Sequence, residues 1–326
     1  MFNLSLTACS FHLRKNNSHS LDSVYPLNDS FDLKLKDGSV VHYERITELF
    51  ELFFEEYAKM YTDSKRKQVF QCTFDRNRNY YDTGSCIMFY VRIHSGIYGS
   101  SSEIFSGDTG ESLLVKKPND IELRPFYLFF FIPKDSDKVK VQKGIMIFQN
   151  VGPYGIKTIT TTHMQEFFSS TFGVTIRCAT ISPNLFIKKV IKQDNIQKLV
   201  MVKNMKSPDN ADNCDLGYGK EVREIGALRF SETKWSIIMD SIKSFAGNKA
   251  SIFEFEDKDY DVLKVDVDIG GRTRRIDLHN LDRLSIIEAI PDSLQGADGH
   301  PILTDLIPYF QGVANEYLSE MVLSIT

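Results

Sequence analysis

The stretch FYLFFFIP, residues 126–133, decides the fold of this chain. Its side chains are apolar at almost every position, so a β-strand formed here is apolar on both faces, as in a strand that is covered from both sides. The run is far shorter than the roughly 20 residues that a membrane-spanning helix needs. We therefore predict a central strand of a buried sheet and no membrane span.

Further elements are predicted on both sides of this strand. In residues 46–60 apolar side chains recur every three or four positions, which is typical of a helix whose apolar stripe lies in the core. Alternating runs around Gly38 predict a hairpin, and residues 160–172 predict a helix that ends at Gly173. Strands are expected near residues 2–13, 68–74, 86–94, 144–149, 174–181 and 196–202.

The polar stretch MKSPDNADNCDLGYGKE, residues 205–221, has no periodic apolar pattern, which favours a linker. A chain of 326 residues also exceeds what one hydrophobic core usually serves. We predict an α+β fold, with a mixed α/β sensor-like domain over residues 1–204 built on a central, mostly buried sheet. A smaller, strand-rich domain over residues 222–326 is expected to contain a hairpin that turns at Gly270 and to end in a helix.

Composition restricts the classes of function. The formal net charge is -4 and the sequence pI is about 6.0, so the chain lacks the general basic field of a protein that coats nucleic acid, and a nucleic-acid surface must be local. The five cysteines form no C-x-x-C pair and no His-flanked cluster. We therefore predict neither a metal site nor a disulfide framework, and we expect a reducing, cytoplasmic location.

The segment 144–158 has the order of parts of a phosphate-binding loop: an apolar strand, glycines, a Lys-Thr pair and a helix. A Walker loop needs its lysine directly after the last glycine, whereas Ile156 separates Gly155 from Lys157. Pro153 also removes one backbone donor from the loop. We predict a glycine turn that reverses a buried strand into its helix, without a nucleotide cofactor. Lys157 remains a candidate contact for a phosphate or for a partner.

A basic cluster follows the tip of the predicted C-terminal hairpin. Guanidinium groups at such a tip can contact a phosphate backbone without reading bases. The favoured interpretation is different: Asp266 and Asp268 lie on one strand face and form cross-strand ion pairs with these arginines. Both interpretations stay open, and the predicted nucleic-acid-binding residues are Arg272, Arg274, Arg275 and Lys157.

An acidic segment suggests a second class of function. Glu256 and Lys258 stand in an E-x-K arrangement, which metal-dependent nucleases use to hold a metal ion and orient a water molecule. No aspartate precedes them at a convincing distance. A solvated loop is therefore the favoured interpretation, no catalytic residue is predicted, and a metal-dependent nuclease acting on DNA or RNA through this segment and Asp266 is the alternative function.

The order HSGIYGSSSEIFSGDTGESLLVKKPNDIELRPFYLFFFIP, KGIMIFQNVGPYGIKTI and ATISPNLFIKKVI resembles an uncharacterised family of bacterial proteins encoded on mobile elements and in phage-defence neighbourhoods. The resemblance covers roughly residues 86–205. The organisation of the whole chain is similar to that of RexA-like and Kiwa-type DNA-binding defence proteins. These resemblances imply a non-enzymatic, homodimeric sensor or adaptor of abortive-infection type, which binds DNA, RNA or a phage or host protein and triggers a partner.

Overall fold

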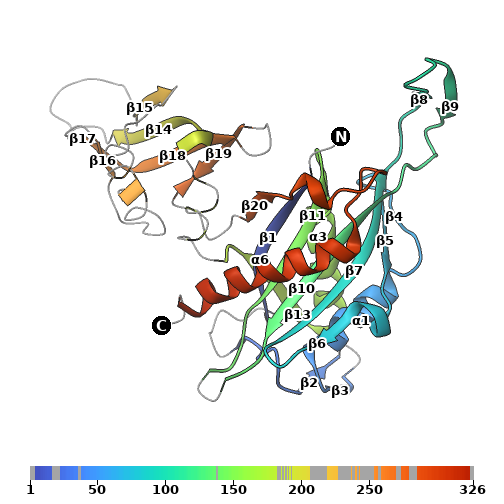
Figure 1. Cartoon of the computed structure of the whole chain (residues 1–326). Helices are drawn as coiled ribbons and strands as arrows, with labels where there is room; N and C mark the ends of the chain where they lie inside the picture. Colours follow the sequence, from blue (N-terminus) through green and yellow to red (C-terminus); the bar gives the residue numbers. More distant parts are fainter. Residues whose placement is uncertain are drawn as a thin grey trace.

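The computed structural model describes residues 4–16, 23–35, 38–136, 139–181, 193–205, 219–226, 253–255, 258–268, 273–278 and 285–323, together with positions 185, 187, 189, 191, 236, 239, 240 and 242. Within these residues the fold is mixed α/β, with a large antiparallel sheet, a smaller sheet and a C-terminal helix (Figure 1). The prediction of an α+β fold with a buried central sheet is confirmed.

Seven strands form the path of the large, curled sheet in the order β13-β1-β11-β10-β7-β5-β4, and every neighbouring pair is antiparallel. Their bounds are β1 (Leu4–Lys15), β4 (Tyr61–Asp63), β5 (Gln68–Thr73), β7 (Cys86–Ile97), β10 (Arg124–Pro133), β11 (Gly144–Val151) and β13 (Val174–Ala179). The predicted central strand is thus confirmed, since β10 is the middle strand of the path. Its Phe129 and Phe130 are fully buried.

Short strands extend this sheet. β6 (Tyr80–Asp82) pairs with β7, and β12 (Tyr154–Gly155) pairs with β11. β1 pairs with β11 along one edge and with two strands along its other edge. On that second edge, β20 (Ile286–Ala289) pairs with the first half of β1 and β13 pairs with the second half. A strand from the last part of the sequence therefore completes the sheet that the first strand begins.

Helices cover both faces of the large sheet (Figure 1). On one face Phe50 lies 4.8 Å from Phe130 and 5.2 Å from Phe168, measured between ring centroids. On the other face Phe310 lies 4.9 Å from Phe129. Consecutive residues of a strand point to opposite faces, so β10 contributes to both layers. The helical segments are α1 (Ile46–Glu56), α3 (Lys157–Phe167) with the π-helical turn η2 (Phe168–Phe172), and α6 (Leu303–Leu323).

Several local predictions are confirmed. The apolar stripe of α1 lies in the core, apart from Met60, which follows the helix and is exposed. β2 (Phe31–Lys34) and β3 (Val40–Tyr43) form the predicted hairpin. The helix α3 begins at Lys157, three residues earlier than expected, and Gly173 has the left-handed φ of 66° that a terminal glycine supplies.

The smaller sheet has the strand order β15-β14-β18-β19. Its strands are β14 (Ile196–Met205), β15 (Gly219–Gly226), β18 (Val262–Asp268) and β19 (Thr273–Asp277). It takes strands from both sides of the predicted linker at 205–221, while β20 and α6 lie on the large sheet. Sheet membership therefore does not follow the predicted domain boundary.

The remaining described elements are short. Two pairs of strands form separate hairpins, β8 (Ser102–Phe105) with β9 (Ser112–Lys116) and β16 (Phe253–Phe255) with β17 (Lys258–Tyr260). The other segments are α2 (Arg76–Asn79), η3 (Gln193–Asn195) and η5 (Asp292–Leu294).

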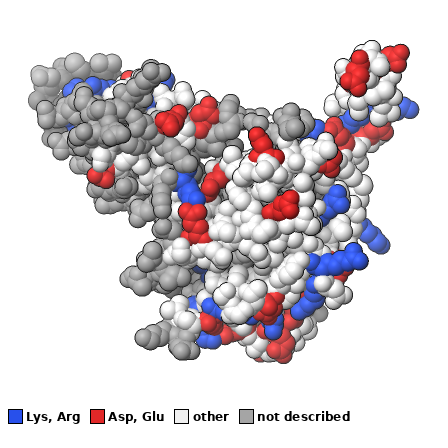
Figure 2. All heavy atoms as spheres, viewed as in Figure 1, with Lys and Arg blue, Asp and Glu red and all other residues white. Residues whose placement is uncertain are grey.

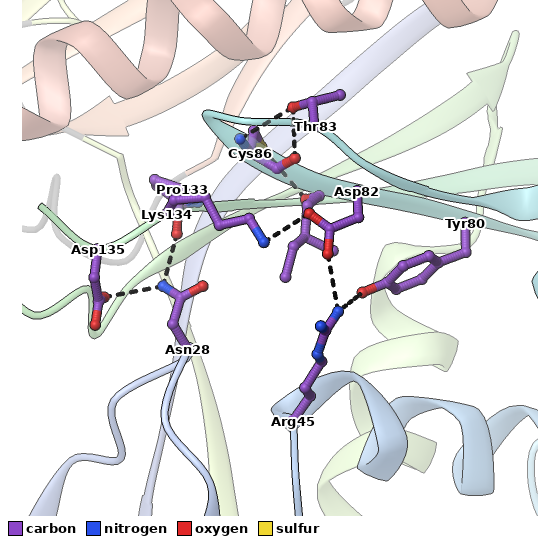
Figure 3. Close-up of polar contacts among 10 residues, drawn as sticks. Asn28, Arg45, Tyr80, Asp82, Thr83, Cys86, Pro133, Lys134 and Asp135 are labelled. Carbon is purple, nitrogen blue, oxygen red and sulfur yellow. Dashed lines mark hydrogen bonds and ion pairs between the residues drawn. The ribbon is translucent and has the colours of Figure 1, made fainter.

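A polar network closes the end of the sheet at which β6 and β10 finish (Figure 3). Asp82 accepts a hydrogen bond from Arg45 at 2.9 Å and pairs with Lys134 at 2.6 Å. The bond from Lys134 is the largest cause that holds the pKa of Asp82 below its usual range. Asn28 donates to the Pro133 carbonyl at 2.8 Å. Because these polar groups are hydrogen-bonded or ion-paired to one another, we infer a structural role for the network: it connects the start of α1 to the sheet.

Candidate functional site

The helix α1 presents two different faces. Its inner face is the aromatic stripe, whereas Leu52, Glu55 and Glu56 point away from the sheet and are exposed. Glu51 pairs with Arg76 at 2.9 Å. By contrast, no described lysine or arginine forms an ion pair with Glu55 or Glu56, two exposed carboxylates of α1.

The end of α3 faces this side of α1. The π-helical turn Phe168–Phe172 directs two phenylalanines into the core and leaves Ser169 and Ser170 exposed and Thr171 half-buried. Such turns occur in helices mostly as single interruptions and often lie at functional sites. Phe167 and Phe172 meet edge to face with ring centroids 5.5 Å apart, which fixes an aromatic wall beside the hydroxyl groups.

An open cleft of about 970 Å³ lies between these two helical segments and the β2–β3 hairpin. We call it the acidic cleft. Its apolar lining comes from aromatic and leucine side chains, its carboxylates come from α1 and α3, and its hydroxyl groups come from η2. The lining residues are Leu35, Tyr43, Leu52, Glu55, Glu56, Tyr57, Glu166, Phe167, Ser169, Ser170, Thr171 and Phe172.

The carboxylates give the cleft its electrostatic character. Glu166 Oε1 lies 3.9 Å from Nη2 of Arg66, but Arg66 binds Asp63 far more closely, at 2.6 Å. The lining itself contains three glutamates and no lysine, arginine or histidine. A cleft with this lining attracts cations and repels phosphates.

The floor of the cleft is rigid and neutral. Burial is the largest cause that raises the pKa of Tyr57 to about 12, so this phenol stays protonated at physiological pH. His163 lies behind it with ring centroids 5.2 Å apart, and its Nδ1 is 3.6 Å from Glu166, beyond hydrogen-bonding distance. Burial lowers the pKa of His163 and keeps it uncharged. The floor of the cleft therefore supplies no positive charge to the glutamates.

The predicted glycine turn, residues 152–155, does not line the acidic cleft. β11 reverses through Gly152, which has a φ of 52°, and Tyr154 pairs back onto Val151 before α3 begins. This is the predicted turn from a buried strand into its helix. Lys157 Nζ hydrogen-bonds to Ser285 beside β20. Its role as a contact for a phosphate or a partner stays a prediction.

The predicted arginine cluster lies on the smaller sheet. Arg275 is opposite Asp266 across β18 and β19, and its guanidinium donates two hydrogen bonds to that carboxylate, at 2.7 and 2.8 Å. The predicted cross-strand ion pair is confirmed for these two residues. Arg272 and the side chain of Arg274 lie outside the described residues, and nucleic-acid binding by this cluster stays a prediction.

The alternative nuclease site is only partly described. Glu256 lies outside the described residues, and Lys258 is 3.5 Å from Glu221. Across the described part of the chain, no three His, Cys, Asp or Glu side chains are grouped as metal ligands would be. In the same part of the chain, no helix combines the length and the hydrophobicity needed to cross a membrane.

No family model, no curated protein and no solved structure matches this chain.

Sequence reasoning missed the acidic cleft, although part of its signal was visible. The glutamates of α1 fall outside the apolar stripe, and SST at residues 169–171 interrupts an otherwise aromatic stretch. Nothing in the sequence shows that these two segments and the β2–β3 hairpin, which are more than 100 residues apart at the extremes, line one cleft.

Proposed function

We propose that this chain is a non-enzymatic sensor or adaptor, acting in the cytoplasm, that binds a protein through the acidic cleft and passes that event to a partner. The observation that carries the proposal is a large open cleft that combines an aromatic wall with three glutamates. Glu55 and Glu56 form no ion pair with a described residue, and Glu166 meets Arg66 only at 3.9 Å. The resemblance of residues 86–205 to proteins from phage-defence neighbourhoods supports anti-phage defence as the setting.

A protein ligand fits the charges better than a nucleic acid. Three carboxylates around one cleft repel a phosphate backbone, and Arg275 already gives two hydrogen bonds to Asp266. Lys157 likewise has a hydroxyl partner in Ser285. A phage or host protein is therefore the proposed ligand, and contact of Arg272 and Arg274 with DNA or RNA is a separate prediction.

The lining indicates the chemistry of the bound segment. Leu35, Leu52 and Phe167 offer an apolar surface, while the flanking glutamates favour lysine or arginine at its border. A helix with one apolar and one basic face satisfies both conditions, because it can lay its apolar face into a groove and direct its charges to the rim. The expected ligand is a basic, amphipathic segment of a protein.

A titration by fluorescence anisotropy tests this function. The probes are a labelled amphipathic peptide of leucine and lysine, the same peptide with glutamate in place of lysine, duplex DNA and single-stranded RNA. We expect the basic peptide to bind, with an affinity that falls as salt rises, and the acidic peptide not to bind. Equal binding of both peptides, or binding of nucleic acid alone, would contradict the proposal.

A further inference from the structure

The connection between β7 and β10 forms a projecting arm, residues 98–120, that is built on the β8–β9 hairpin (Figure 1). β7 and β10 themselves are adjacent and antiparallel in the large sheet. A short turn would be enough to join them, so the arm is an insertion that the large sheet does not require.

The arm has a fixed shape at both ends. At its base Gly99 donates to the Pro118 carbonyl at 2.7 Å, and Tyr98 donates to the Lys67 carbonyl at 3.0 Å. At its tip the backbone N–H of Ser106 donates to the Glu111 carbonyl at 2.8 Å. A partner therefore meets a preformed hairpin, which lowers the entropy cost of binding.

Apolar side chains are exposed on both faces of this arm. Ile104 and Leu114 are opposite each other on one face, and Phe105 and Val115 lie on the other. Together with Leu113 these residues have exposed fractions between 44% and 66%. A two-stranded sheet with no covering layer is marginally stable in water, and a contiguous apolar patch of this kind indicates an interaction site.

Charge differs along the arm. The tip carries Asp108 and Glu111, and its visible face shows acidic but no basic side chains (Figure 2). At the base, Lys117 is exposed on the arm and Lys67, which precedes β5, is exposed beside it, whereas Lys116 is buried and donates to the Ile97 carbonyl at 3.4 Å. Asp120 is the acidic residue of the arm at this end. Two such arms placed antiparallel would bring each acidic tip to the basic base of the other.

We propose that the arm binds the arm of a second copy of this chain, antiparallel and related by a twofold axis, so that the apolar faces meet and the tip carboxylates pair with the base lysines. A self-complementary patch of this kind is what an isologous dimer requires. The exposed Ile97, where the base of the arm joins β7, extends the apolar surface that the second tip reaches.

Other occupants fit the arm less well. Its acidic tip repels nucleic acid and anionic lipid surfaces, and it also repels the acidic cleft of a second copy. The lysines at the base of another arm are the complementary charges that this molecule itself supplies. The proposed dimer does not depend on what binds in the acidic cleft. An experiment can therefore contradict the dimer without contradicting the function proposed for the cleft, and the reverse is also true.

A charge exchange measured by sedimentation equilibrium tests the pairing. The tip variant is Asp108→Lys with Glu111→Lys, and the base variant is Lys67→Glu with Lys117→Glu. Each alone should raise the dimer dissociation constant about 100-fold, because several attractive pairs per dimer become repulsive. An equimolar mixture of the two variants should form a heterodimer, since the lysines of one tip then face the glutamates of the other base, and the acidic tip of the second variant faces the lysines at the base of the first.

The matched control is Lys15→Glu with Lys34→Glu, which makes the same change of charge at exposed positions of β1 and β2. It should dimerise as the wild type does. A wild type that is monomeric at high micromolar concentration would overturn the proposal. The apolar surface of the arm would then be a binding site for a different protein. Dimers that persist in both arm variants, or variants that stay monomeric when mixed, would also overturn it.

Discussion

Replacing Phe129 with aspartate is expected to unfold the large sheet. Phe129 is fully buried on the middle strand and packs edge to face on Phe310 of α6. The substitution removes a large apolar side chain and places a carboxylate at a fully buried position among aromatic side chains, at a cost of about 5 kcal/mol or more. Domains are stable by only about 5–15 kcal/mol, so a soluble folded protein is not expected.

Circular dichroism and thermal melting measure this effect. Val40→Asp is the matched control, because it introduces the same charge into a strand where the side chain is 64% exposed. The control should melt within a few degrees of the wild type. A soluble Phe129→Asp protein with the melting temperature of the wild type would show that β10 is not the centre of the core.

The sequence was sufficient to predict the elements whose patterns are local. Residues 126–133 identified β10 as central because apolar side chains on both strand faces leave few other environments. The stripe of α1, the hairpin around Gly38 and the cap at Gly173 follow from spacing and backbone preference in the same way.

The remaining features depend on tertiary structure. The arm was missed because its strands of four and five residues show no clear alternation between a core face and a wet face. The return of β20 and α6 to the large sheet was missed because the sequence gives no pairing partner for a strand that is nearly 300 residues from β1. The acidic cleft was missed for the second of these reasons, because its walls come from segments that are far apart in the sequence and meet only in the folded protein.

Reversing the charge of the acidic cleft should abolish binding of the basic amphipathic peptide. The variant is Glu55→Lys, Glu56→Lys and Glu166→Lys, which replaces each carboxylate of the lining with an ammonium group. These side chains are exposed or nearly so, and the fold should tolerate the changes. Repulsion across the rim should raise the peptide dissociation constant by about 100-fold or more at low salt.

The control for this prediction changes three exposed aspartates from different elements to lysine, namely Asp194, Asp259 and Asp292. The net charge of the protein then changes equally, so non-specific attraction of the peptide is reduced to the same extent. We expect this control to lose only the small, salt-sensitive part of the affinity. Equal losses in both variants would mean that the peptide responds to total charge and not to the cleft.

Hydrogen exchange of the protein with and without the basic peptide tests the central claim most directly, because it shows where the peptide binds. The account predicts slower exchange in residues 52–57 and 166–172, the two segments that contribute most of the lining of the acidic cleft, and unchanged exchange in β18 and β19. Protection confined to β18 and β19 or to the projecting arm, with none at the cleft, would contradict the account.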